Sequence, residues 1–161
     1  MTIAVGEKIP ETTFKTMTEA GAKNMPASEV FGGKKVVLFA VPGAFTPTCH
    51  LQHMPGFVKH YDAFKSKGVD TVACTGVNDV FVFGSWAKSS GADDRILFLA
   101  DGNGDFAKAM GLDIDLSVAS LGVRSKRYAL YAEDGVIKAL LVEDSPGSAE
   151  QSSAEALLAA I

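Results

Sequence analysis

The sequence predicts an α/β protein in which helices cover both faces of a mixed central β-sheet. Two observations carry this prediction: apolar runs of strand length alternate with segments of helical periodicity, and a hairpin pattern follows in the last third of the chain. With 161 residues, 47% of them apolar, the chain is long enough to bury a sizeable core. Because no repeat, linker or low-complexity tract interrupts it, we expect a single domain over residues 1–161.

One apolar run, two prolines and one glycine predict the first strand and the helices that follow it. Residues 35–41 form a continuous apolar run, as expected for a strand buried on both faces. A helix should begin after Thr46, a good N-cap, with Pro47 at the first helical position. We expect Pro55 to break or kink this helix after about two turns. The next helical pattern, which ends at Gly68, contains Phe57, Val58, Tyr61 and Phe64.

The alternation continues to the C-terminus. Residues 69–77 predict a strand, and Asn78 or Asp79 can cap a helix that reaches about Ser90. A third buried strand over 96–100 and a short helix over 106–110 follow. The remaining elements are a hairpin of 128–132 and 136–142 around Asp134-Gly135, and a last helix that ends near Ile161 and has a capping box at Ser152 and Glu155.

Charge and hydropathy exclude several classes of partner. The net charge is −4, and the lysines and arginines are scattered, so neither nucleic acid nor an anionic membrane surface is expected as a partner. No apolar run approaches the length of a membrane span. The N-terminal residues lack the charged and apolar regions of a signal peptide, and a cytoplasmic location is therefore expected.

The two cysteines, Cys49 and Cys74, indicate thiol chemistry. Two are too few for a secreted disulfide scaffold, and a cytosolic pair indicates catalysis or sensing before a structural bond. Cys49 falls in the first turn of the helix that Thr46 opens, where free N–H groups and the helix dipole favour an anion. A thiol in such a place ionises more easily than a free thiol, which makes Cys49 a candidate nucleophile. Cys74 fits a small buried side chain of its strand equally well.

Three histidines, His50, His53 and His60, lie close to Cys49 in sequence. They do not predict a metal site, because one cysteine and two histidines on a single helix do not converge as zinc ligands. His53 follows Cys49 by four residues and shares its helical face, so a cysteine–imidazole contact is possible. A cysteine protease would also need a third group to orient the imidazole. We therefore predict a surface or packing role for His53.

The most distinctive segment reads Pro42-Gly43-Ala44-Phe45-Thr46-Pro47-Thr48-Cys49 and continues into His53-Met54-Pro55-Gly56-Phe57. It closely resembles the active-site segment of peroxiredoxins, in the type II branch that groups the plant type II enzymes with the fifth mammalian class. Further blocks in the family's order and spacing extend the resemblance over nearly the whole chain: Val77-Asn78-Asp79, Trp86-Ala87-Lys88, and residues 98–102 and 122–128.

This resemblance implies a thioredoxin-like fold with added N-terminal structure. It also implies a peroxidase that reduces hydrogen peroxide and organic hydroperoxides to water and alcohols, without a metal or organic cofactor. Carried over by position, Cys49 is the peroxidatic cysteine, Thr46 its hydroxyl partner and Pro42 the shielding proline. The family's arginine matches Arg127, with Arg124 as a second choice.

The resemblance leaves the recycling step open. The segment that would hold a C-terminal resolving cysteine contains no thiol, whereas plant type II enzymes have a second cysteine where Cys74 stands. Two routes therefore remain open. Cys74 can resolve the Cys49 sulfenic acid, or an external thiol, from glutathione with glutaredoxin or from thioredoxin, can reduce the sulfenic acid directly. A homodimer packed near the active-site loop is also implied. The alternative to a peroxidase is a redox sensor or relay that oxidises a partner protein. The intact set of Pro42, Thr46, Cys49 and Arg127 argues against a non-catalytic module.

Overall fold

The structure, a computed structural model, describes all residues, 1–161. In chain order the strands are β1 (Thr13–Thr18), β2 (Gly21–Pro26), β3 (Lys35–Val41), β4 (Thr71–Gly76), β5 (Leu97–Ala100), β6 (Asp113–Asp115), β7 (Val123–Ser125), β8 (Tyr128–Glu133) and β9 (Val136–Val142). The helices are α1 (Ala27–Phe31), the π-helical turn η1 (Cys49–His53), α2 (Met54–Lys59), α3 (Tyr61–Ser66), α4 (Val80–Ser89), α5 (Asp105–Met110), the 3-10 turn η2 (Ser117–Ala119) and α6 (Ala154–Ala160).

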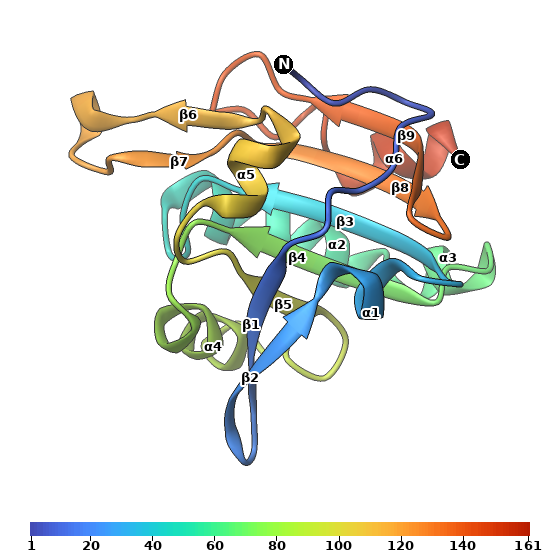
Figure 1. The fold of residues 1–161 in the computed structure, drawn as a ribbon, viewed down its shortest axis with the longest axis horizontal. Helices are drawn as coiled ribbons and strands as arrows, with labels where there is room; N and C mark the ends of the chain where they lie inside the picture. Colours follow the sequence, from blue (N-terminus) through green and yellow to red (C-terminus); the bar gives the residue numbers. More distant parts are fainter.

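A seven-stranded mixed sheet runs through the molecule in the order β2-β1-β5-β4-β3-β8-β9 (Figure 1). Strands β3, β4 and β5 are parallel, whereas β8 and β9 continue the sheet antiparallel on one side. The β1–β2 hairpin extends it on the other side, and β6 pairs with β7 in a separate ribbon. The predicted mixed α/β sheet is therefore confirmed, with the N-terminal addition that the resemblance implied.

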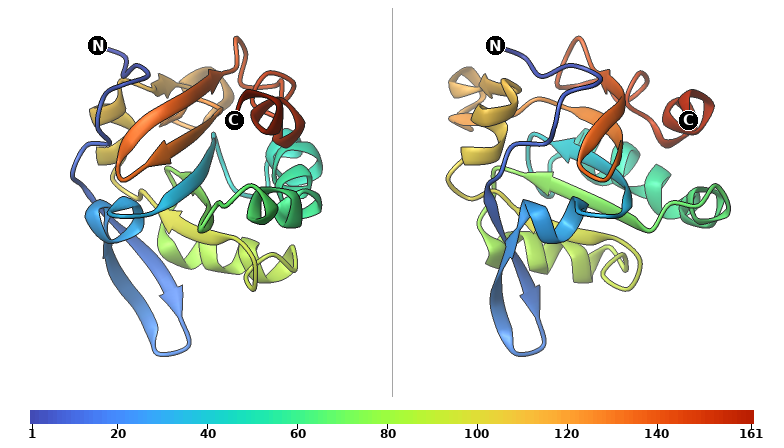
Figure 2. Two further views of the ribbon diagram at one scale, coloured as in Figure 1. Left: turned by 90° about the vertical axis from the view of Figure 1, so that its right-hand side faces the viewer. Right: turned by 45° about the vertical axis from the view of Figure 1, so that its right-hand side comes forward.

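Strand β3 shows how the sheet separates two cores. Its residues alternate, so that Val37, Phe39 and Val41 face one hydrophobic cluster while Val36, Leu38 and Ala40 face the other. Helices α2, α3, α4 and α6 cover the first cluster, and α1 and α5 cover the second. The left view of Figure 2 shows these helices on opposite sides of the sheet. Because both faces are covered, β3 is a continuous apolar run with the bounds expected from the sequence.

The helix after β3 differs from expectation at Pro55. It continues through the proline, because Cys49–His53 widen into a π-helical turn in which the Met54 N–H donates to the Cys49 carbonyl. Proline has no N–H and its ring crowds the carbonyl four residues before it, so a wider turn accommodates it inside a helix. The break comes instead at His60, whose φ of −97° and ψ of 11° separate α2 from α3.

The last helix begins one residue later than the capping box predicted. Ser153, not Ser152, is the N-cap of α6, and its hydroxyl accepts from the Ala156 N–H at 3.1 Å. Ser152 is buried and donates its hydroxyl to the Glu143 carboxylate at 2.7 Å. In α4 the predicted cap is confirmed, since the Asp79 carboxylate accepts from the Val82 N–H. None of the helices has the length and apolar character needed to cross a bilayer.

Candidate active site

Cys49 lies at the start of a helix, as the sequence predicted, and its side chain is fully buried. The first helical hydrogen bond runs from the His50 N–H to the Thr46 carbonyl at 2.8 Å. The Thr46 hydroxyl, however, donates to the Gly43 carbonyl at 2.7 Å and does not cap the helix. That bond commits the hydroxyl hydrogen and leaves the oxygen lone pairs of Thr46 free to accept.

Arg127 brings a positive charge to the sulfur. It immediately precedes β8, is 2% exposed, and donates from one terminal nitrogen to Cys49 Sγ at 3.0 Å. The same nitrogen and Nε donate to the Pro146 carbonyl at 2.9 and 3.1 Å. No carboxylate lies within ion-pair distance of this guanidinium, since His60–Glu155 is the salt bridge found in the structure. A buried, permanently charged guanidinium that donates to the sulfur stabilises negative charge that develops there.

Arg124, the second choice for the family's arginine, points elsewhere. Its Nε donates to the Leu121 carbonyl at 2.7 Å and its Nη1 to the Pro42 carbonyl at 3.3 Å. Pro42 is buried and presents only this carbonyl, since proline has no N–H. Arg124 therefore holds the loop before Cys49, whereas Arg127 contacts the sulfur itself.

The loop from Pro42 to Thr46 is tightly fixed. A Cβ on Gly43 would come within 3.1 Å of the Arg124 guanidinium, so a larger residue here would push that side chain aside by a few tenths of an ångström. The Ala44 N–H donates to the Asn78 side chain at 2.9 Å. Phe45 has a φ of 62°, a left-handed conformation that is strained for this residue type. Several contacts therefore determine where the Thr46 hydroxyl and Cys49 lie.

His53 is buried, so of the two roles predicted for it packing is confirmed and a surface position is not. Its ring is 2% exposed and packs edge-on against Phe39 and Phe57. One ring nitrogen lies 3.2 Å from a terminal nitrogen of Arg127, and the other lies 2.8 Å from the Ser152 carbonyl. Burial first, and the Arg127 charge second, lower the pKa of His53 from its ordinary 6.5 to about 3. The imidazole is therefore neutral near neutral pH.

A C-terminal strap, residues 143–152, lies against the site, a position that the sequence did not predict for it. Its backbone carbonyls accept from three side chains around the sulfur, and a backbone carbonyl leaves no signature in a sequence. The three pairs are Pro146 with Arg127, Gly147 with Thr48, and Ser152 with His53. The buried Glu143 carboxylate holds the end of the strap by accepting from both the N–H and the hydroxyl of Ser152.

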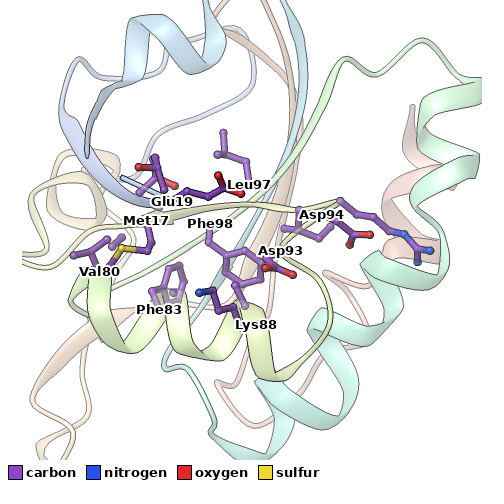
Figure 3. A pocket seen from close by; sticks show the side chains of 16 residues that line it. Met17, Glu19, Val80, Phe83, Lys88, Asp93, Asp94, Leu97 and Phe98 are labelled. Atoms are coloured by element: carbon purple, nitrogen blue, oxygen red, sulfur yellow. The ribbon is translucent and has the colours of Figure 1, made fainter. Parts of the chain in front are cut away.

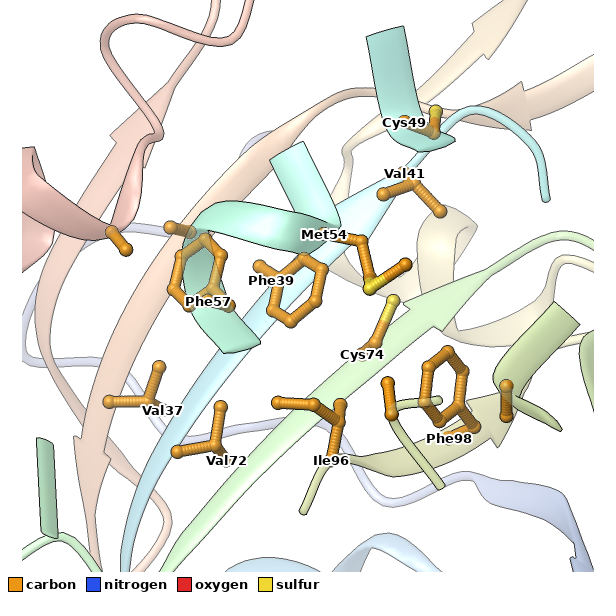
Figure 4. Packing of buried hydrophobic residues seen from close by; sticks show 14 of the residues in the cluster. Val37, Phe39, Val41, Cys49, Met54, Phe57, Val72, Cys74, Ile96 and Phe98 are labelled. Atoms are coloured by element: carbon orange, nitrogen blue, oxygen red, sulfur yellow. The ribbon is translucent and has the colours of Figure 1, made fainter. Parts of the chain in front are cut away.

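Cys74 lies in the centre of β4, paired with Phe39 on β3 and Phe98 on β5. Its thiol is fully buried and faces the same hydrophobic cluster as Cys49, and both cysteines are free. In the view of Figure 4, Val41 and Met54 lie between the two cysteines. Burial, and to a smaller extent the neighbouring Cys49 charge, raise the pKa of the Cys74 thiol well above its ordinary value. Cys74 is therefore a poor nucleophile in the folded protein.

Other parts of the molecule do not add to this site. The cavity drawn in Figure 3, of about 480 Å³, lies between α4 and strands β1 and β5, and its lining includes neither Cys49 nor Arg127. No group of three or more His, Cys, Asp or Glu side chains is arranged to hold a metal ion.

Comparison with known proteins gives the family. The sequence model of the Redoxin family matches residues 4–158. The chain is 45% identical to Peroxiredoxin-2E, chloroplastic, of Arabidopsis thaliana, over 99% of this chain and 69% of that protein. It is 42% identical to Peroxiredoxin-2B of the same plant, over 99% and 98%. The chain belongs to the type II peroxiredoxins.

Solved structures agree with this assignment. The reduced Prx3 of Vibrio vulnificus in complex with H₂O₂ has a TM-score of 0.93 and 47% identity, covering 98% of each chain. The oxidized Prx3 of the same bacterium has a TM-score of 0.90 and 48% identity, covering 99% of each chain. The expected thioredoxin-like fold is confirmed. Peroxiredoxins are thiol-dependent peroxidases, so this protein is an enzyme that acts on a peroxide and uses a thiol reductant.

Proposed function

We propose that this peroxiredoxin reduces hydrogen peroxide and organic hydroperoxides at Cys49, with Arg127, Thr46 and Pro42 as its functional partners. The contact of 3.0 Å between the Arg127 guanidinium and Cys49 Sγ carries the proposal. This contact places the permanent positive charge of Arg127 next to the sulfur that attacks the peroxide. The relative from Vibrio vulnificus, solved in complex with H₂O₂, supports hydrogen peroxide as one substrate.

The chemical step is a displacement at oxygen. The Cys49 thiolate attacks the hydroxyl oxygen of the hydroperoxide, so that a sulfur–oxygen bond forms as the oxygen–oxygen bond breaks. The departing alkoxide or hydroxide takes a proton from solvent and leaves as alcohol or water. The sulfur of Cys49 gives up the electron pair that reduces the peroxide and is thereby oxidised to a sulfenic acid. Arg127 stabilises the thiolate before the step and the departing oxygen during it.

Thr46 supplies an acceptor for this step. Because its hydroxyl hydrogen is committed to the Gly43 carbonyl, its oxygen can accept the peroxide O–H. That hydrogen bond would hold the peroxide in line with the sulfur. Pro42 adds no N–H that would draw water to the sulfur.

External thiols return Cys49 to its reduced form. Glutathione attacks the sulfenic sulfur, releases water and leaves a mixed disulfide. A second thiol, from glutathione, glutaredoxin or thioredoxin, then attacks the glutathione sulfur and frees the Cys49 thiolate. The position of Cys74 supports this external route, because its thiol is fully buried in the middle of β4 and forms no bond to Cys49 in the structure.

Two cysteine variants test the proposal. We expect Cys49→Ser to abolish peroxide turnover and Cys74→Ser to retain it when glutathione and glutaredoxin are supplied, as measured by thiol consumption. Intact mass after one equivalent of peroxide should show one added oxygen, and a glutathione adduct after glutathione is added. Turnover by Cys49→Ser would contradict the assignment of Cys49. Loss of two hydrogens would show a Cys49–Cys74 bond, and stoichiometric peroxide consumption would indicate a relay that oxidises a partner protein.

We also propose a homodimer that packs near the active-site loop. Phe45, Phe81 and Val123 are large apolar residues with 48%, 70% and 46% exposure. They belong to the loop before Cys49, the start of α4 and the β6–β7 ribbon, which share the left edge of Figure 1. The loop contacts both neighbours through Asn78 and Arg124. An exposed apolar group of this kind supports a protein–protein contact.

Sedimentation velocity tests the dimer. We expect the wild type to sediment as a dimer and Phe81→Glu to shift it to monomer, because a carboxylate would be buried without a partner. Val5→Glu, a change at an equally apolar and 57% exposed position of the N-terminal segment, serves as the control. A wild type that remains monomeric at high concentration would remove the proposal.

A further inference from the structure

Three protein groups fix the orientation of the Arg127 guanidinium: the Pro146 carbonyl, Cys49 Sγ and the His53 imidazole. Nε and one terminal nitrogen reach the Pro146 carbonyl, and that same terminal nitrogen reaches Cys49 Sγ. The other terminal nitrogen, Nη1, has a single protein partner within hydrogen-bond distance, Nδ1 of His53 at 3.2 Å. The plane of the guanidinium is therefore fixed at one side by the strap and at the other by an imidazole.

The partners of His53 determine its tautomer. The guanidinium of Arg127 can only donate, so Nδ1 must carry a lone pair. The Ser152 carbonyl can only accept, so Nε2 must carry the hydrogen. A neutral ring with its hydrogen on Nε2 satisfies both contacts, whereas the other tautomer or an imidazolium places an N–H against the guanidinium.

We propose that His53 is a positioning residue for the peroxide reaction, acting through the lone pair of Nδ1 to orient the Arg127 guanidinium toward Cys49. The Ser152 carbonyl selects the tautomer that makes this possible, so two strap carbonyls orient Arg127, that of Pro146 directly and that of Ser152 through His53. The inference rests on the proposed role of Cys49 and goes beyond the four residues already assigned to the reaction.

A packing role alone does not account for these contacts. The ring of His53 does pack against Phe39 and Phe57, with centroid separations of 5.2 and 5.4 Å. A phenylalanine would make those contacts as well, but it would leave the buried Arg127 N–H and the Ser152 carbonyl without partners. The lowered pKa of His53 agrees with a ring that stays neutral while the enzyme works.

A matched pair of variants separates orientation from packing. The amide oxygen of asparagine can take the place of Nδ1, so His53→Asn keeps an acceptor for Arg127. The longer glutamine places its amide near Nε2, so His53→Gln keeps the contact with Ser152 and loses the acceptor. We expect His53→Gln to lower the rate constant of Cys49 with hydrogen peroxide by roughly 10- to 100-fold, because misplacing a reacting group costs about that much. His53→Asn should recover most of this loss.

The rate can be followed in the protein itself. Trp86 is the only tryptophan and donates to the imidazole of His50, next to Cys49, so its fluorescence should report oxidation of the sulfur. His60→Gln is the matched control, because His60 pairs with Glu155 away from the sulfur. It should keep the wild-type rate. Thermal unfolding of all variants shows which changes reduce stability.

The pH dependence gives a readout that a structural role would not move. The charged or titratable groups that face the ring are Arg127 and, through it, Cys49, while Glu143 reaches it only through Ser152. In His53→Gln a less well oriented guanidinium should move the pH–rate profile to higher pH, and in His53→Asn the profile should move back.

Nitrogen-15 chemical shifts of the wild-type histidines test the same idea without a substitution. They should show Nδ1 of His53 unprotonated and Nε2 protonated from about pH 5 to 8. The proposal is overturned if Nδ1 carries the hydrogen, if both variants react like the wild type, or if asparagine is no faster than glutamine. Turnover by Cys49→Ser would instead refute the proposed function, so the two failures are distinct.

Discussion

Arg127 places a permanent positive charge where water is excluded and no carboxylate balances it. A charge in such a position is costly unless other groups compensate it. The compensation comes from the Pro146 carbonyl, the His53 lone pair and Cys49 Sγ. Of these three groups only the sulfur can carry a negative charge, so only the sulfur can balance the charge of the guanidinium. The same donors remain in place when negative charge moves to the departing oxygen.

Replacing Arg127 tests this at the level of one side chain. We expect Arg127→Gln to lower the peroxide rate constant by about 10²- to 10³-fold, as the loss of one preorganised donor does in other enzymes. Arg124→Gln should have a much smaller effect, because that guanidinium donates to backbone carbonyls and not to the sulfur. Stopped-flow fluorescence gives both rates, and equal losses in the two variants would argue against the special role of Arg127.

Thr46 can be tested by removing or keeping its hydroxyl. Thr46→Val preserves shape but removes the acceptor, so we expect a roughly 10- to 100-fold slower reaction with peroxide. Thr46→Ser keeps the hydroxyl and its bond to the Gly43 carbonyl, and should stay close to the wild type. If valine and serine at position 46 react alike, the hydroxyl does not hold the peroxide.

At the scale of elements, the prolines and serines of the sequence predicted where helices occur, but not where each helix breaks or which residue caps it. The helix begins at Pro47 as predicted, although the Thr46 hydroxyl does not cap it, and Pro55 is accommodated in a helix with a π turn and does not end it. The outcome depends on tertiary packing, because the buried Met54 and Phe57 hold the chain in a helix past the proline. Sequence rules for proline do not contain that information.

The cap of α6 is a second case, and it leads to a prediction. Ser152 and Ser153 are both possible N-caps by composition, but the Glu143 carboxylate binds Ser152 and leaves Ser153 to cap the helix. We expect Ser153→Ala to lower the free energy of unfolding by about 1 kcal/mol, and Ser153→Asp to restore it. Urea unfolding measures both, and an alanine variant as stable as the wild type would show that this cap is not needed.

At the scale of the whole molecule, the sheet was predictable where both of its faces are buried. Strand β3 has the predicted bounds because its whole apolar run lies between two cores. The β1–β2 hairpin and the β6–β7 ribbon are largely exposed and carry no comparable pattern, and only the resemblance pointed to the first of them.

The functional site likewise has one part that could be predicted from the sequence and one part that could not. The cysteine loop is local in sequence and could be found from its residues, and the resemblance supplied Arg127. The burial of His53 and the strap carbonyls depend on contacts across about a hundred residues, such as His53 with Ser152, which are 99 positions apart. Spacing along a helix therefore placed His53 beside Cys49 but could not reveal that a distant loop would cover it.

The buried imidazole should also affect the stability of the whole fold in acid. His53 takes up a proton near its ordinary pKa of 6.5 when unfolded, but only near pKa 3 when folded. Between these values the unfolded state binds more protons, so acidification favours unfolding, with a slope of at most about 1.4 kcal/mol per pH unit. We therefore expect the stability that His53 contributes to be complete above about pH 6.5 and to be lost as the pH falls toward 3.

Comparing the wild type with His53→Gln isolates this effect. Burial raises the pKa of Asp101, which acts in the opposite direction because its folded form gains a proton earlier on acidification. Asp101 is present in both proteins, so its contribution cancels in the difference. Urea unfolding at a series of pH values should show a steeper acid loss of stability for the wild type than for His53→Gln. Parallel curves would mean that His53 titrates alike in the folded and unfolded chains, which a ring enclosed by Arg127 and the strap cannot do.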